Sequence, residues 1–345
     1  MPLRMIRVVV PEDAGGDLEE LLAEAEVDRV GLWRGEDGGT MAELLVSAEA
    51  AEPLTDRLED RFGDAEGFRL VILATEAVLP RPSEPEEDDR DGEKDEDRPR
   101  DRISREELYA DVTDGLAISP TFLAMAGLSA VVAAVGLLRD DVAVIIGAMV
   151  IAPLLRPNVG LALAATLADR KLGWRAVLTN AAGSGLALAL AVATGLLVEV
   201  DPSVPAIASR SFIDHQSLIL AMAAGAAGTL AFTRGLAGAV IGVMVAVALL
   251  PPLVSAGLLL GSGHLRPAIG AFLLTGGNLV SINLAGVVTF LLQGVRPRSW
   301  SQAERAKKAG LLAAGVWLVL LLALAGLLAL GGELGLGPGV VPGEE

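Results

Sequence analysis

The sequence predicts an α-helical polytopic membrane protein of about seven spans, built as a 3+3 inverted repeat plus one, with an N-terminal α+β domain of ferredoxin-like βαββαβ order. Three observations lead to this prediction. Long apolar stretches dominate the chain after residue 119, and two of these stretches have nearly the same sequence. The first 79 residues alternate instead between strand-like and helix-like segments.

Residues 1–79 are expected to form a cytosolic domain, because the start of the chain lacks the apolar core of a signal peptide. β-Branched runs alternate there with amphipathic runs, and Gly38–Gly39 predicts a hairpin turn. The expected strands and helices, in order, are Met5–Val10, Asp17–Ala25, Val27–Arg34, Met41–Ser47, Glu52–Phe62 and Phe68–Leu79. A ferredoxin-like domain of this kind favours a role in subunit assembly, with ligand sensing as the alternative.

Two short segments are expected to join this domain to the membrane. Residues 80–102 contain no large apolar side chain and hold 11 acidic and 6 basic ones, which predicts an acidic disordered tether. Residues 103–118 predict a juxtamembrane amphipathic helix, in which Ser104 and Glu107 have the spacing of a capping box. The transmembrane domain is expected over 119–332, followed by a C-terminal tail, 333–345.

Seven stretches are apolar and long enough to cross about 30 Å of hydrocarbon. Their approximate limits are 120–138, 142–168, 176–198, 216–232, 236–260, 268–293 and 311–331. With the N-terminus inside, the loops carry nine Lys and Arg side chains on the inner side and three on the outer side. The sequence therefore predicts a multi-pass protein of the inner membrane, with its N-terminus cytoplasmic and its C-terminus outside.

The two similar stretches cover residues 123–157 and 220–252. Matches at an offset of 95 are Gly147 with Gly242, Met149 with Met244, Leu154 with Leu249, and Pro157 with Pro252. Three spans separate equivalent positions, and because three is odd, the copies are expected to run in opposite directions. Repeat 1 then covers about 120–198 and repeat 2 about 216–293. Inverted repeats of this kind are typical of membrane transporters, which expose a central site to each side in turn.

Prolines are expected to interrupt one span in each repeat. Pro153 and Pro157 should break or bend the second span, and Pro251–Pro252 the fifth, because a proline removes an amide donor and crowds the carbonyl four residues earlier. Backbone groups freed inside a membrane must find other partners. Both predicted breaks are therefore candidate walls of a solute pathway.

Polar side chains inside the predicted spans are further candidates. Arg156 is the ionisable residue placed well inside a span, where an arginine costs at least ~2.5 kcal/mol, which favours contact with an anion, protein or water. Alternatively, its long side chain reaches the cytosolic headgroups. The neutral polar residues either hold helices together or line the pathway. They are Asn158, Asn180, Ser184, Thr275, Asn278, Ser281 and Asn283.

Charge and composition exclude several classes of protein. The first 115 residues hold 34 acidic and 14 basic side chains, against 10 and 13 in the remaining 230, so nucleic acid is excluded as a partner. Cysteine is absent, and His215 and His264 are far apart in sequence, so no metal site and no cofactor is expected. An enzyme is not expected either, because HExxH, GxSxG and phosphate-binding glycine motifs are missing.

Two segments, SREELYADV at 104–112 and GAMVIAPLLRP at 147–157, resemble a prokaryotic membrane family of uncharacterised hydrophobic-domain proteins, domain-of-unknown-function family 389. The resemblance covers roughly residues 100–300. It implies a multi-span inner-membrane protein, sometimes with an extra soluble domain, and it supplies no established substrate or catalytic residue.

The function expected from these observations is a transporter or channel for a small solute, with an anion favoured by Arg156. The alternative is a membrane-bound sensor whose N-terminal domain binds a cytosolic metabolite. The expected partners are the lipid bilayer, further copies of the chain in a homo-oligomer, and a small-molecule solute or regulator.

Overall fold

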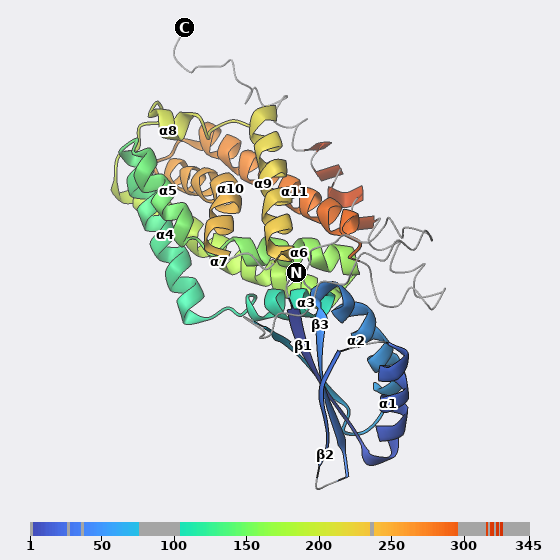
Figure 1. Cartoon of the computed structure of the whole chain (residues 1–345). Helices are drawn as coiled ribbons and strands as arrows, with labels where there is room; N and C mark the ends of the chain where they lie inside the picture. The colour runs from blue at the N-terminus through green and yellow to red at the C-terminus, as the bar shows by residue number, and fades with distance from the viewer. Residues whose placement is uncertain are drawn as a thin grey trace. The chain divides into compact units, whose positions relative to one another are not determined.

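The computed structural model describes residues 3–25, 28–35, 38–75, 104–234 and 238–295, together with a few residues between 315 and 326 (Figure 1). The tether predicted at 80–102 and most of the span predicted at 311–331 lie outside the described residues. Contacts divide the chain into two compact units, Met1–Tyr109 and Ala110–Glu345.

The N-terminal unit contains a four-stranded antiparallel sheet with the strand order β2-β3-β1-β4. Its strands are β1 (Leu3–Val10), β2 (Asp28–Arg34), β3 (Thr40–Ser47) and β4 (Arg69–Ala74). A short 3-10 turn, η1 (Glu12–Ala14), leads into α1 (Gly15–Glu24), and α2 (Ala48–Phe62) connects β3 to β4. These elements follow the predicted order of strands and helices.

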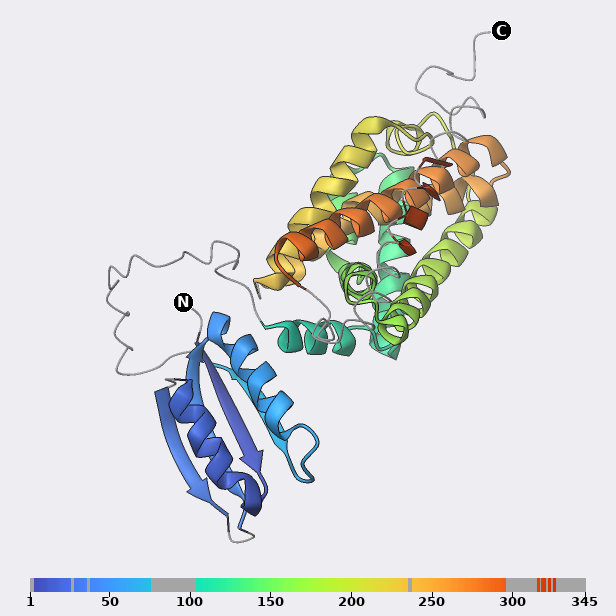
Figure 2. The same ribbon diagram turned by 90° about the vertical axis from the view of Figure 1, so that its right-hand side faces the viewer.

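The core of this unit lies between the sheet and its two helices, which cover one face of the sheet (Figure 2). Successive side chains of a strand point to opposite faces, so every second residue of β1 is buried, including Ile6 and Val8. Leu18 and Leu22 of α1 and Leu58 of α2 meet them from the other side. The alternating apolar pattern of β1 therefore fixes which face the helices cover.

The helix α3 (Arg105–Asp114) begins as the capping-box spacing predicts, but only half of the box forms. The Ser104 Oγ accepts a hydrogen bond from the Glu107 amide at 3.2 Å. The Glu107 carboxylate instead binds Arg4, accepting from Nε at 2.8 Å and from Nη2 at 3.0 Å. A charge-assisted pair with two bonds is stronger than the single bond to an amide that the box would provide.

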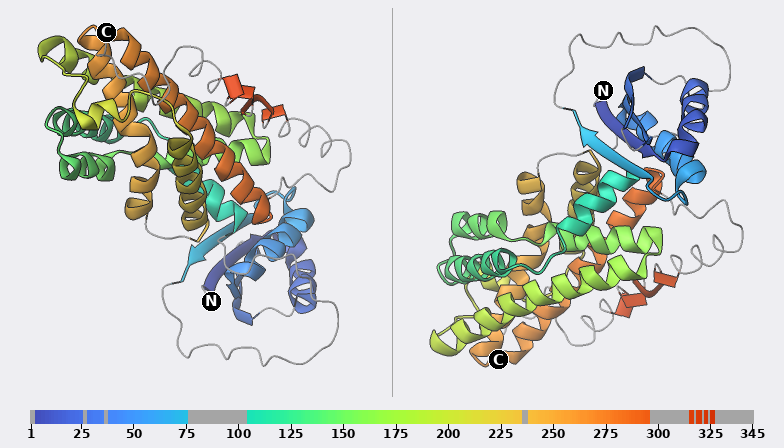
Figure 3. Two further views of the ribbon diagram at one scale, coloured as in Figure 1. Left: turned by 90° about the horizontal axis from the view of Figure 1, so that it is seen from above. Right: turned by 90° about the horizontal axis from the view of Figure 1, so that it is seen from below.

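The second unit is built from helices. They are α4 (Pro120–Leu138), α5 (Val142–Ile151), α6 (Leu155–Leu167), α7 (Arg170–Leu197), α8 (Pro205–Ala208), α9 (His215–Thr233), α10 (Gly238–Gly261) and α11 (Leu265–Leu292). Side-chain oxygens accept from first-turn amides where α4, α5, α7 and α9 begin, and so satisfy donors that a helix leaves open. These caps are Ser119, Asp141, Asp169 and Asp214. The helices α4 and α5 lie side by side (Figure 3).

Several of these helices have the length and composition of membrane spans. The helices α4, α7, α9 and α11 each qualify, and α5 and α6 form a fifth candidate as one span bent by 57°. The fully described stretch of α10, Val245–Gly261, is also apolar and is shorter than the other candidates. The described residues thus support a membrane protein with four or five candidate spans, and the seventh predicted span lies mostly outside them.

The predicted break in the second span is confirmed. Between α5 and α6 lie Ala152, Pro153 and Leu154, and Ala152 has the extended conformation (φ −64°, ψ 122°) that a following proline favours. Pro157 is the third residue of α6, where an amide has no partner inside the helix. Pro153 therefore ends one helix, whereas Pro157 is accommodated in the first turn of the next.

The predicted break at Pro251–Pro252 is wrong, because α10 continues through both prolines. At the offset of 95, Pro252 corresponds to Pro157, which also lies inside a helix. Pro153 corresponds to Ala248. The first repeat breaks because it has a proline at this additional position.

The helices α7 and α10 approach each other so closely that only glycine fits at their crossing. A Cβ on Gly195 would lie 2.2 Å from the carbonyl oxygen of Leu258, and a Cβ on Gly261 would lie 2.3 Å from that of Val192. Small residues allow helices to pack tightly where lipid provides no hydrophobic drive between them. This crossing joins helices from the two stretches predicted as repeats.

Replacing Gly195 by alanine is expected to lower the stability of the full chain by roughly 1–3 kcal/mol, because the added methyl forces the helices apart. Gly185→Ala is a matched control on the same helix, since a Cβ there meets nothing within 4 Å. Thermal unfolding in detergent micelles should give a lower melting temperature for Gly195→Ala only. Equal melting temperatures for the two variants would contradict the close crossing.

Candidate functional site

Three asparagines from three helices meet beside the break between α5 and α6. Asn158 of α6, Asn180 of α7 and Asn283 of α11 are 1%, 9% and 5% exposed. The Oδ1 of Asn158 accepts hydrogen bonds from Nδ2 of Asn180 at 3.1 Å and from Nδ2 of Asn283 at 3.3 Å. Asn158 itself donates to the Leu154 carbonyl at 2.7 Å. We call Asn158, Asn180 and Asn283 the asparagine cluster.

A fourth asparagine completes the hydrogen bonding of α10. Because Pro252 has no amide hydrogen, the carbonyl of Ala248, four residues earlier, lacks its helical donor. Asn278 of α11 donates to this carbonyl from Nδ2 at 2.8 Å. The neighbouring helix thus satisfies the oxygen that Pro252 frees.

Four buried side-chain oxygens within α10 and α11 have no hydrogen-bond partner. They are Oδ1 of Asn278 and Asn283 and Oγ of Ser255 and Ser281. A buried oxygen without a partner costs about 1–3 kcal/mol, so natural proteins rarely keep one without a use. These oxygens can accept hydrogen bonds or bind a cation.

A small pocket of about 170 Å³ adjoins the asparagine cluster. Asn283 is the polar residue in its lining, and the other lining side chains are apolar ones from α6, from α11 and from Val316 and Leu320. This volume is smaller than the pockets that hold drug-sized ligands. The pocket has room for a small solute beside a polar side chain.

Arg156 lies outside the asparagine cluster. Its side chain is exposed, and its Cδ lies 2.1 Å from where a Cβ on Gly115 would be. This placement matches the alternative in which the guanidinium extends to the surface. The helices α4 to α11 bury no charged side chain among their described residues, so the cluster is electrically neutral.

Two of the remaining candidates are Thr275 and Ser184. Thr275 turns back to its own helix and donates to the Ala271 carbonyl at 2.8 Å, and Ser184 is half-buried on α7. No group of three His, Cys, Asp or Glu side chains that could hold a metal ion comes together in the described part of the chain.

Sequence reasoning missed two backbone acceptors and one side chain: the carbonyls of Leu154 and Ala248, and the buried Ser255. Counting four residues back from Pro252 would have found the Ala248 carbonyl, since a proline always leaves that oxygen without its donor. Nothing in the local sequence distinguishes Leu154 or Ser255 from their neighbours.

Replacing Asn278 by leucine is expected to lower stability by about 1–3 kcal/mol, because the Ala248 carbonyl loses its donor while the branched shape of the side chain is kept. Adding Pro252→Ala should recover part of this loss, since an alanine amide at position 252 can donate to the same carbonyl. Thermal unfolding of the two single variants and the double variant measures this coupling. Additive effects would show that Asn278 does not substitute for the missing amide.

Comparison with known proteins adds a family but no structure. The family model described as "Domain of unknown function (DUF389)" matches residues 149–284, which include the break and all four asparagines. An uncharacterized protein of Methanocaldococcus jannaschii is 34% identical over 327 residues, covering 94% of this chain and 98% of the relative. No solved structure matches the chain.

Proposed function

Because the chain belongs to the family of the domain of unknown function DUF389, whose description prescribes no activity, we propose a function from the geometry of the helical unit. The helical unit is a transporter or channel that carries a small polar solute across the membrane. The pathway runs between two inverted halves, along the asparagine cluster. The expectation of an anion depended on Arg156. Because this side chain is exposed, we assign no negative charge to the solute.

One observation carries this proposal: a neutral polar cluster is buried at a helix break, where the two halves touch. Asn158 and Asn180 belong to the first half, and Asn283 reaches them from the second. Irregular backbone at membrane depth is tolerated where protein covers it or where it lines a water-filled cavity. Broken helices around a central site are typical of secondary transporters.

Two reciprocal contacts support the repeat. A Cβ on Gly286 in α11 would lie 2.9 Å from the Cβ of Ala162 in α6, and a Cβ on Gly257 in α10 would lie 2.5 Å from the Cβ of Ala191 in α7. Ala162 and Gly257 are 95 residues apart, and so are Ala191 and Gly286. The contact of position 162 with position 286 is therefore repeated, with the halves exchanged, as the contact of position 257 with position 191. A two-fold relation between the halves requires this exchange.

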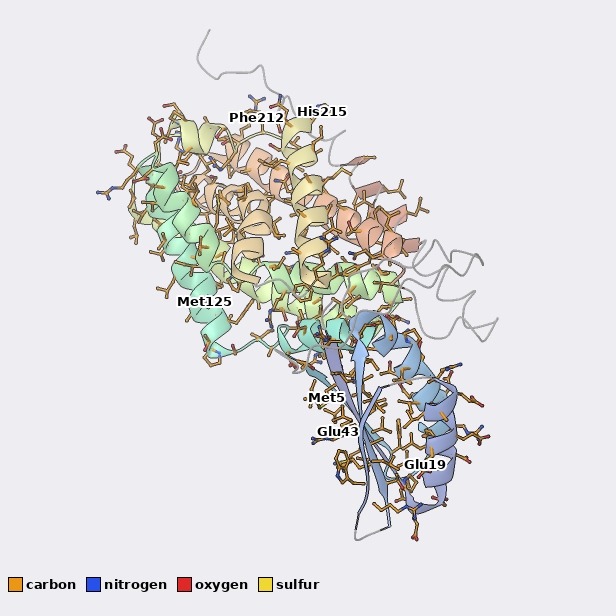
Figure 4. All side chains as sticks on the ribbon, in the orientation of Figure 1. Met5, Glu19, Glu43, Met125, Phe212 and His215 are labelled. Carbon is orange, nitrogen blue, oxygen red and sulfur yellow. The ribbon has the colours of Figure 1, made fainter. Side chains whose placement is uncertain are left out.

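The directions of α4 and α9 support inversion. These are the first helices of the two halves. In Figure 4, Met125, near the start of α4, lies toward the lower end of the helical unit, and His215, the first residue of α9, lies at its upper end. Equivalent helices therefore run in opposite directions along the vertical of that view.

For orientation, we propose a multi-pass inner-membrane protein with a cytoplasmic N-terminus and an external C-terminus, as the loop charges favour. Arg139 and Arg234 test this, because they are 95 residues apart and each follows the first helix of its half. In intact cells, a membrane-impermeant maleimide should label Arg139→Cys, whereas Arg234→Cys should react only after permeabilisation. The wild-type chain has no cysteine and gives no background. Labelling of both variants from one side would contradict the inversion.

For the N-terminal unit, we propose a ferredoxin-like fold and a role in assembling a homo-oligomer. The strand order β2-β3-β1-β4 and the two helices on one face support this fold. On the opposite face, Val71 and Leu73 of β4 are 45% and 42% exposed and lie beside Arg7 and Met5 of β1. Exposed apolar side chains on a sheet face favour contact with another protein surface.

Flux into proteoliposomes tests the proposed pathway. Vesicles with the full chain should take up at least one member of a panel of small cations, anions and osmolytes. Asn158→Leu should reduce this uptake at least about tenfold, because the variant removes the acceptor that joins the two halves. Thr194→Val is the matched control, since the Thr194 hydroxyl bonds to Leu190 within α7 at 2.9 Å. Vesicles impermeable to the whole panel would contradict the proposal.

A further inference from the structure

The amide groups of α11 are oriented by their acceptors. The Nδ2 of Asn278 donates to the Ala248 carbonyl, and the Nδ2 of Asn283 donates to Asn158 and to the Leu279 carbonyl at 2.8 Å. Turning either amide over would place oxygen against oxygen, so the Oδ1 atoms must face away from these partners. The amide nitrogens of Asn278 and Asn283 are therefore engaged, whereas their Oδ1 atoms are free.

Asn278 and Ser281 place two of the free oxygens together. The two residues are three positions apart on α11, so their side chains are neighbours on the helix surface. Asn278 is 4% exposed and Ser281 fully buried, and neither Oδ1 nor Oγ has a partner. The adjacent stretch of α10 adds a third oxygen, because Pro251 cannot donate to the Val247 carbonyl.

We propose that Asn278 Oδ1 and Ser281 Oγ, with the Val247 carbonyl of α10 as a third ligand, bind a bare monovalent metal cation such as Na⁺ or K⁺. Resting on the proposed function, this assigns an ion site to the same seam between helices. Neutral oxygens, including carbonyls released from regular helix, are the ligands that membrane proteins use for these ions. Asn278 and Ser281 do not line the pocket beside Asn283, so the ion and the solute would occupy different places.

The proposal is tested by thermal unfolding of the purified full chain in detergent micelles. NaCl or KCl is titrated against choline chloride at constant ionic strength. A saturable rise in melting temperature of about 5 °C is expected with Na⁺ or K⁺ at one hundred times the dissociation constant. Choline, which is too large for the site, should give no rise.

The variant Ser281→Ala distinguishes a hydroxyl that binds an ion from one that has only a structural role. In choline chloride, this variant should melt at or above the wild-type temperature, because it removes an unpaired buried oxygen. In NaCl or KCl, it should melt below the wild type, so the order of the two proteins reverses with the salt. Thr289→Val is the control on α11, since its hydroxyl is bonded to the Ala285 carbonyl at 2.8 Å, and it should keep the full shift.

The same shift in Ser281→Ala as in the wild type would overturn the proposal. So would equal melting temperatures of the wild type in Na⁺, K⁺ and choline, as expected where water alone fills the site. Neither result depends on solute flux. If proteoliposomes transport a solute while cations leave the melting temperature unchanged, the proposed ion site is wrong and the proposed pathway stands.

Discussion

A helix that crosses lipid has no water to satisfy the backbone groups that a proline releases. In the helical unit, Asn278 meets this requirement from the next helix, because it supplies the donor that Pro252 withholds from the Ala248 carbonyl. Beside the break, Asn158 of the asparagine cluster adds a hydrogen bond to the Leu154 carbonyl, where α6 begins. Buried asparagines therefore bond to the backbone next to the prolines of α6 and α10.

Close packing of the helices makes these side-chain bonds possible. An asparagine is short, so its amide reaches a neighbouring backbone only where two helices nearly touch. Gly195, Gly257 and Gly286 provide such approaches where α7 crosses α10 and where α6 crosses α11. The small residues and the asparagines thus act together. Glycines allow two helix backbones to approach, and asparagine amides then form hydrogen bonds between the helices.

Local chemistry explains which predictions could be made from the sequence. The break at Pro153 follows from the residue itself and the one before it, and the Ser104 cap depends on a spacing of three. The hydrogen bond to the Ala248 carbonyl of α10 could not be predicted this way, because its donor, Asn278, comes from another helix. The exposure of Arg156 likewise depends on its packing beside Gly115, and the grouping of three asparagines out of seven polar candidates depends on the tertiary fold.

The break between α5 and α6 has no counterpart in α10, and this difference affects how the two proposed halves could move. Alternation by exchange of shapes requires that each half can adopt the shape of the other. Ala152 is held extended before Pro153, which keeps the first half broken, while α10 continues through Ala248 without a break. The two end states of such a cycle would therefore differ in free energy. A transporter built this way has a resting preference for facing one compartment, set by a single proline.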